Sequence, residues 1–162
     1  MKRASTILIV MLAMAGQAAN WYVKSNGGTG AGTDWTTAWS IAGLNSKWSS
    51  VAGGDTVWMA GGSYSDSISI EKSGSAGNYI YIKRVRSTDS TPTAAAGWSS
   101  GFDSQVIVAP ANGIPCYWGG GSGLGSYIYI DGRIDSGISF RLANVSQNDF
   151  SYPGAVYFGS AV

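Results

Sequence analysis

Short stretches in which apolar and polar residues alternate recur along most of this chain. In Ile68-Ser69-Ile70 and Ile80-Tyr81-Ile82, branched apolar residues occupy every second position, which turns one face of a strand toward a core and the other toward solvent. The alternation returns at Val106/Val108, Ile128/Ile130, Ile138/Phe140 and Val156/Phe158. Gly, Ser, Asp and Asn turns separate the strands between residues 52 and 85. The pattern predicts short strands that stack as the coils of a solenoid.

A second pattern, with apolar residues three and four positions apart, follows Thr33-Asp34-Trp35. It comprises Trp39, Ile41, Leu44, Trp48 and Val51. This spacing is typical of one face of a short helix, which we expect to end at Ala52-Gly-Gly54. The helix would cover the open apolar end of the first coil, so the tryptophans are interpreted mainly as core and cap.

The clearest internal repeat is Tyr79-Ile-Tyr-Ile82 against Tyr127-Ile-Tyr-Ile130, 48 positions apart with the strand at 106–108 between them. Two coils of about 24 residues would account for this offset. Residues 88–102 contain Pro92 and Trp98 and break the rhythm. They predict an excursion from the coil.

The segment from Asn20 to Val85 also resembles a known family. The matching motifs are Trp21-Tyr-Val-Lys-Ser-Asn-Gly-Gly28, Gly54-Asp55-Thr56-Val57, Ala60-Gly-Gly-Ser-Tyr64 and Lys72-Ser-Gly-Ser-Ala-Gly-Asn78. They are similar to the N-terminal entry of secreted right-handed parallel β-helix proteins of the pectate-lyase-like superfamily. After residue 87 the resemblance rests on strand spacing and on Ile128-Tyr-Ile-Asp-Gly132.

The resemblance implies an all-β, right-handed parallel β-helix with a short N-terminal capping helix. Residues 20–162 would then form the N-terminal part of a single domain. The strand expected at 156–158 begins another coil that nothing closes before Val162, so we expect a chain truncated at its C-terminus. A jelly-roll sandwich is the alternative fold, and it would need hairpins in place of coils that run one way.

Residues 1–19 read as a signal peptide. Lys2 and Arg3 precede an apolar run from Ala4 to Ala15, and Gly16-Gln-Ala-Ala19 supplies a cleavage site near Ala18 or Ala19. We therefore expect a secreted or cell-surface protein with no membrane span after cleavage.

Composition excludes several classes of function. Without the leader the chain has eight basic and nine acidic residues, a net charge of −1, and this balance argues against binding to nucleic acid. The absence of His from the whole sequence excludes catalytic triads and zinc sites that depend on imidazole. The single Cys116 predicts a buried free thiol, so stability must come from packing.

Candidate binding residues lie opposite the apolar ones. If the apolar pairs point inward, Tyr81, Ile107, Tyr129 and Tyr157 point outward and would stack as one column, with Tyr79, Tyr127, Lys83 and Asp131 sharing that parity. Tyrosine rings beside a cation suit the apolar faces and polar edges of sugars. The alternative is that Tyr is simply a good strand residue and that the column lies beneath the excursion at 88–102.

The densest group of ionisable residues is Asp131-Gly-Arg133-Ile-Asp135. The resemblance implies that an Arg or Lys can act as the base of a uronate lyase, with calcium held by acidic side chains in the full-length protein. Hydrolysis would instead need two carboxylates. Asp-Gly after a strand is also an ordinary turn in which Arg133 pairs on the surface, and we prefer this interpretation. No cofactor is evident and no catalytic residue is assigned.

These observations predict an exported β-helix protein that binds or degrades extracellular polysaccharide. As an enzyme it would be a lyase or glycoside hydrolase whose active-site coils lie outside this chain. The alternative is a non-catalytic cell-surface adhesin or matrix protein in which the solenoid is a stiff rod.

Overall fold

The computed structural model describes residues 17–111, 114–118, 125–132, 138–140 and 156–158. The predictions for Arg133 and Asp135 concern residues outside these ranges. Within them the chain is built mostly of strands in parallel sheets, with few and short helical segments. This agrees with the mainly β composition expected from the alternating pattern.

The strands form three sheets, and every described strand pair is parallel. The β1 sheet has the order β1 (Asn20–Gly28), β2 (Thr56–Met59), β5 (Ile80–Arg84), β8 (Ile128–Asp131). The β3 sheet contains β3 (Gly62–Tyr64), β6 (Val106–Val108) and β9 (Ile138–Phe140). The β4 sheet contains β4 (Ile68–Ile70), β7 (Cys116–Trp118) and β10 (Val156–Phe158).

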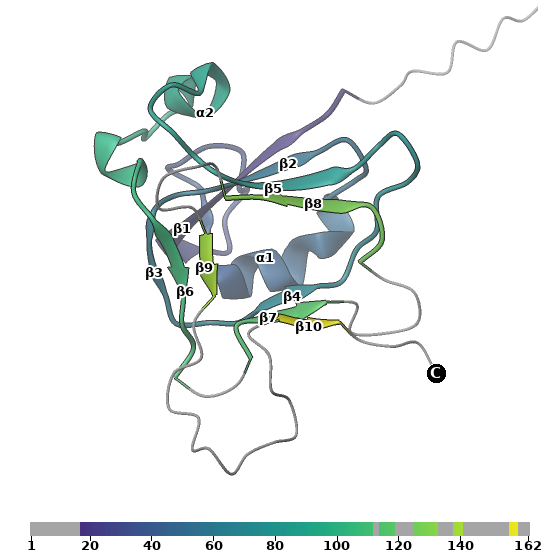
Figure 1. Ribbon diagram of the computed structural model, residues 1–162. Coiled ribbons are helices and arrows are strands. Elements are labelled where there is room, and N and C mark those ends of the chain that lie inside the picture. The colour runs from purple at the N-terminus through teal and green to yellow at the C-terminus, as the bar shows by residue number, and fades with distance from the viewer. Residues whose placement is uncertain (1–16, 112–113, 119–124, 133–137, 141–155, 159–162) are drawn as a thin grey trace, which may run out of the picture.

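From β2 onward the chain visits the sheets in a fixed rotation. β2, β3 and β4 enter the three sheets in turn, and β5 to β7 and then β8 to β10 repeat the same order. In Figure 1 the β1 sheet runs along the top, the β3 sheet down the left and the β4 sheet along the bottom. Each sheet thus receives one strand in every round of the rotation.

The periodicity of this rotation differs from the predicted one. Ile80 pairs directly with Ile128, 48 positions further on, and the strand at Val106–Val108 belongs to a different sheet. The two tyrosine repeats are therefore neighbours in one sheet, and the prediction of two 24-residue coils between them is wrong. The excursion after β5 accounts for much of the extra length.

Helix α1 (Ile41–Lys47) and the 3-10 turn η1 (Trp48–Ser50) supply the predicted short helix. It begins after Trp39 because the side chain of Ser40 accepts a hydrogen bond from the backbone N–H of Gly43, at 3.0 Å, and caps the first turn. Ile41, Leu44 and Trp48 are buried along one side. Trp35, by contrast, lies outside the helix and packs in a separate cluster.

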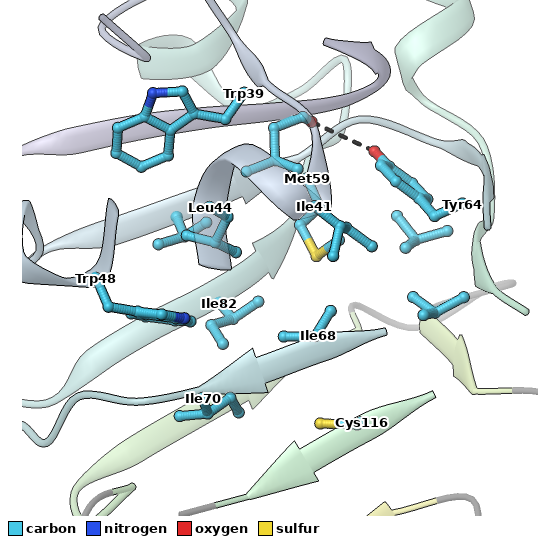
Figure 2. Packing of buried hydrophobic residues seen from close by; sticks show 14 of the residues in the cluster. Trp39, Ile41, Leu44, Trp48, Met59, Tyr64, Ile68, Ile70, Ile82 and Cys116 are labelled. Carbon is cyan, nitrogen blue, oxygen red and sulfur yellow. Dashed lines mark hydrogen bonds between the residues drawn. The ribbon is translucent and has the colours of Figure 1, made fainter. Parts of the chain in front are cut away.

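Side chains from all three sheets and from α1 share one apolar core. Ile82 of the β1 sheet, Val108 of the β3 sheet and Ile70 of the β4 sheet are each buried in it with Leu44. Figure 2 shows the α1 side chains directed toward those of the strands. The inward positions predicted from the alternation at 68–70, 80–82 and 106–108 are confirmed.

The core also contains two polar groups, the hydroxyl of Tyr64 and the thiol of Cys116. Tyr64 donates its hydroxyl to the carbonyl oxygen of Ala60, at 2.6 Å, and burial raises the pKa of this phenol. Cys116 is a buried free thiol, as expected, and burial raises its pKa to about 12. A thiol with so high a pKa is a poor nucleophile at neutral pH.

Candidate functional site

Four tyrosines lie next to one another on the outer face of the β1 sheet, and we call them the tyrosine surface: Tyr79, Tyr81, Tyr127 and Tyr129. Because Ile80 and Ile82 point inward and are 0% and 1% exposed, Tyr81 between them must point outward. Tyr129 is the direct partner of Tyr81 on β8 and is 52% exposed. Tyr79 and Tyr127 precede these strands and are 39% and 45% exposed.

The four rings contact one another across the two strands. Ring centroids are 5.8 Å apart between Tyr81 and Tyr129 and 5.7 Å apart between Tyr79 and Tyr127. Along the strand, Tyr79 and Tyr81 are 6.4 Å apart. These separations lie within the range of favourable aromatic pairs, so the rings support one another as a continuous surface.

A cation borders the tyrosine surface on β5. The ammonium nitrogen of Lys83 lies 4.9 Å from the ring centroid of Tyr81 and 5.9 Å from that of Trp58. Both distances are within the reach of cation–π attraction. Asp131 is the register partner of Lys83 on β8 and is half-buried. Two opposite charges therefore lie side by side next to the rings.

Tyr127 has a backbone conformation that tyrosine rarely adopts. Its φ is 55°, in the left-handed region, and it is the one non-glycine residue with positive φ in the part of the chain that the structure describes. Its carbonyl oxygen accepts a hydrogen bond from the backbone N–H of Ile80, at 3.0 Å. The fold thus holds a bulky, half-exposed ring at a position that Asn or Gly would occupy with less strain.

The excursion between β5 and β6 covers the neighbouring part of the same sheet. It contains α2 (Ser90–Ala94) and η2 (Ser100–Phe102), and Figure 1 shows α2 outside the sheets at the upper left. The indole nitrogen of Trp35 donates to the carbonyl oxygen of Pro92, at 2.7 Å, and its ring packs 4.8 Å from that of Phe102. Trp35 and Phe102 pack with Tyr22, Trp58 and Val85 in a second apolar cluster.

The excursion leaves the tyrosine surface open. Tyr79, Tyr127 and Tyr129 keep more than a third of their surface exposed, whereas Trp58, beside the excursion, keeps 8%. The alternative that the predicted tyrosine column lies beneath residues 88–102 is therefore wrong for these rings.

An ion pair fixes the excursion to the end of β5. Arg84 donates from Nη2 to Asp103 Oδ1 at 2.6 Å and from Nε to the carbonyl oxygen of Ser104 at 2.7 Å. Hydrogen bonds from the backbone N–H and hydroxyl of Ser87, and then the charges of Arg84 and Arg86, hold the pKa of the Asp103 carboxyl below its usual value. The edge of the covered region is thus anchored.

The predicted single column of outward residues is wrong. Ile107 lies on the β3 sheet, and Tyr157 is in register with Tyr117 on the β4 sheet. Only Tyr81 and Tyr129 stack as expected, because the chain turns a corner between consecutive strands. Of the other predicted binding residues, Lys83 and Asp131 lie beside them, while Arg133 lies outside the described residues.

Two aromatic residues were missed in the sequence. Trp58 alternates with the inward Val57 and Met59 on β2 and is in register with Lys83. Tyr117, on the β4 sheet, is 37% exposed and far along the rotation from the tyrosine surface. The parity of β2 was available in the sequence and would have identified Trp58.

Asp55 caps the turn before β2, since its Oδ2 accepts from the backbone N–H of Ala52 at 2.9 Å. It also accepts hydrogen bonds from the N-terminal segment, from the backbone N–H of Ala19 to Oδ1 at 2.8 Å and from the indole of Trp21 to Oδ2 at 2.9 Å. This second role has no local signal in the sequence.

Comparison with known proteins gives no relatives: no family model, no curated protein and no solved structure matches this chain. A search of the described residues finds no group of three or more His, Cys, Asp or Glu side chains placed to hold a metal ion. The helices in this part of the chain are all too short or too polar to cross a bilayer.

Proposed function

We propose that this chain is an exported parallel β-helix protein that binds extracellular polysaccharide on the tyrosine surface. The observation that carries the proposal is the open, mutually packed set of four tyrosine rings on the outer face of the β1 sheet. Export is supported by the leader-like residues 1–19.

The β-helix part of the proposal draws on the strand order. Three parallel sheets that receive one strand each in a repeated rotation are what a solenoid requires. Parallel crossover connections are almost always right-handed, which favours the right-handed form. In this arrangement α1 would act as the cap of the first coil, and the resemblance to the pectate-lyase-like superfamily supports the same architecture.

The chemistry of the surface suits a carbohydrate chain. Tyrosine offers an apolar ring face and a hydroxyl that both donates and accepts hydrogen bonds. A sugar ring likewise has apolar C–H faces and polar edges. The rings of Tyr81 and Tyr129 would stack on the sugar faces, and Lys83 and Asp131 would meet hydroxyl or carboxylate groups at the edge.

Depolymerising activity is a further prediction. A lyase or glycoside hydrolase should shorten one glycan in a screen run with and without calcium, and a non-catalytic adhesin or matrix rod should shorten none. Because Arg133 is interpreted as a turn residue, Arg133→Ala should leave any such activity unchanged.

The proposal is tested by measuring dissociation constants against a panel of polygalacturonate, alginate, xylan and a β-1,4-glucan. Removing an aromatic anchor from a binding surface typically costs more than 1 kcal/mol, so Tyr129→Ala should weaken binding about tenfold. Tyr129→Phe keeps the ring and should retain most of the affinity.

Tyr117→Ala is the matched control, since Tyr117 is also a half-exposed tyrosine on a strand but belongs to the β4 sheet. It should bind as the unmodified chain does. Equal loss in Tyr117→Ala and Tyr129→Ala, or no binding to any glycan of the panel, would disprove the proposed site.

A further inference from the structure

In the N-terminal segment, Ala19 is hydrogen-bonded to the folded chain through both its backbone N–H and its carbonyl oxygen. Its backbone N–H donates to Asp55 Oδ1 at 2.8 Å, and its carbonyl oxygen accepts from the backbone N–H of Thr56 at 2.9 Å. Gln17 and Ala18 before it are exposed, whereas Ala19 is partly buried. The change from exposed residues to a hydrogen-bonded, partly buried residue therefore falls between Ala18 and Ala19.

Asp55, which receives this N–H, is a buried carboxylate. It is 4% exposed, and its oxygens accept three hydrogen bonds, all from neutral N–H groups. Among the residues that the structure describes, the ion pair joins Arg84 and Asp103, and no cationic side chain pairs with Asp55. Burying a carboxylate without a cation is costly, even when it is hydrogen-bonded.

The sequence places a cleavage site at the same boundary. Gly16-Gln-Ala18 has small residues at the first and third positions before the Ala18–Ala19 bond, the arrangement that leader peptidases recognise. Cleavage one residue later would put Gln17, a larger polar residue, at the third position before the bond. The sequence alone left both bonds open, and the contacts of Ala19 favour the earlier one.

We infer that Asp55 is the receptor for the N-terminus of the processed chain. Hydrolysis of the Ala18–Ala19 peptide bond by a leader peptidase consumes one water, leaves a carboxylate on Ala18 and frees an α-amino group on Ala19. That group is protonated at neutral pH. Its nitrogen is the atom that already lies 2.8 Å from Asp55 Oδ1.

Processing would thus convert a neutral hydrogen bond into a charge-assisted ion pair without moving either residue. Asp55 also holds the indole of Trp21 and the turn at Ala52. A stronger bond at Ala19 therefore fastens the first residues of β1 to β2. Cleavage becomes a step that stabilises the folded chain as well as one that removes the leader.

This inference rests on the exported nature of the protein and is independent of glycan binding. Its first test is the N-terminal residue of the protein recovered outside the producing cell, read from the intact mass. The expected residue is Ala19. A chain that begins at Gly16, after Ala13-Met-Ala15, or at Asn20 would overturn the assignment of the bond.

The second test measures thermal stability and does not require export. Chains that begin at Ala19 and at Ala18 are released from a removable fusion partner, each with Asp55 and with Asp55→Asn. At pH 7 the Ala19 chain should unfold about 5 °C above the Ala18 chain, the shift expected for a charged hydrogen bond in a domain of this size. Asp55→Asn should abolish the difference.

The dependence of this difference in melting temperature on pH is the third test. Shortening the chain by one residue would not by itself make the difference depend on pH. Pairing with a carboxylate favours the charged amine, so the extra stability should be present below the ordinary α-amino pKa of about 8 and be lost as the pH rises further. Equal melting temperatures of the Ala19 and Ala18 chains at pH 7, or a difference that persists at pH 11, would overturn the inference even if Asp55→Asn fails to fold.

Discussion

At the scale of single residues, Tyr127 is the position at which a substitution should best distinguish an effect on binding from an effect on stability. It combines a left-handed φ of 55° with an exposed ring that contacts Tyr79. A left-handed conformation costs a residue with a Cβ about 1–2 kcal/mol. A strained aromatic residue on an open surface is more simply explained by a binding role than by stability.

We therefore expect Tyr127→Asn to have opposite effects on stability and binding. Asn tolerates the left-handed region, so the melting temperature should rise by about 2–4 °C, as expected for a gain of about 1 kcal/mol. Glycan affinity should fall because one ring of the tyrosine surface is lost. Calorimetry and a binding titration on the same sample check both, and a variant that is less stable yet binds equally well would contradict this role.

At the scale of elements, the contact between α1 and β1 depends on the absence of a side chain. A Cβ added at Gly43 in α1 would collide with the carbonyl oxygen of Gly28 at the end of β1. The helix can lie this close to the strand only because Gly43 has no side chain. Ser40 then caps the helix at the same junction.

Gly43→Ala should destabilise the fold, although Ala is the better helix former by about 1 kcal/mol. Relieving the collision requires the helix to shift, a kind of overpacking that costs about 1–3 kcal/mol. Gly28→Ala is the control, because a Cβ there meets open space. Chemical denaturation measures both, and a Gly43→Ala variant more stable than the unmodified chain would show that α1 does not pack against β1 in this way.

The strands that the sequence predicted are those with a complete apolar alternation, such as β4 at Ile68–Ile70 and β5 at Ile80–Arg84. The short β3 at Gly62–Tyr64 was not predicted, since it contains a glycine and reads as a turn. Its conformation depends on pairing with β6, more than forty positions away. Local pattern carries no information on such a partner.

At the scale of the whole molecule, strand order decides which residues meet. The sequence showed that Tyr81 and Tyr129 share a parity, but it did not show that they are adjacent, because the length of one rotation depends on the excursion. It also merged Tyr157 into their column, although the structure assigns that residue to another sheet. The sequence therefore predicted which types of residue make up the candidate site. Which of these residues are neighbours became clear only from the pairing of the strands.

A disulfide can measure this adjacency. In a Cys116→Ala background, Tyr81→Cys with Tyr129→Cys should cross-link on mild oxidation, since neighbouring strands are about 4.8 Å apart and a disulfide spans Cα atoms up to about 7 Å apart. Thr56→Cys with Tyr129→Cys, two strands apart, is the control and should stay reduced. If the Thr56→Cys, Tyr129→Cys pair cross-links and the Tyr81→Cys, Tyr129→Cys pair stays reduced, Tyr81 and Tyr129 do not lie on neighbouring strands.

The central claim, that glycan binds on the tyrosine surface, is tested most directly by protection from chemical modification. The protein is nitrated at tyrosine with and without each glycan of the panel, and each residue is quantified by peptide mass spectrometry. Exposed Tyr117 and buried Tyr64 serve as internal references. The account predicts that a bound glycan slows nitration of Tyr79, Tyr127 and Tyr129 and leaves that of Tyr117 unchanged. Equal protection of Tyr117 and Tyr129, or no protection by any glycan, would contradict it.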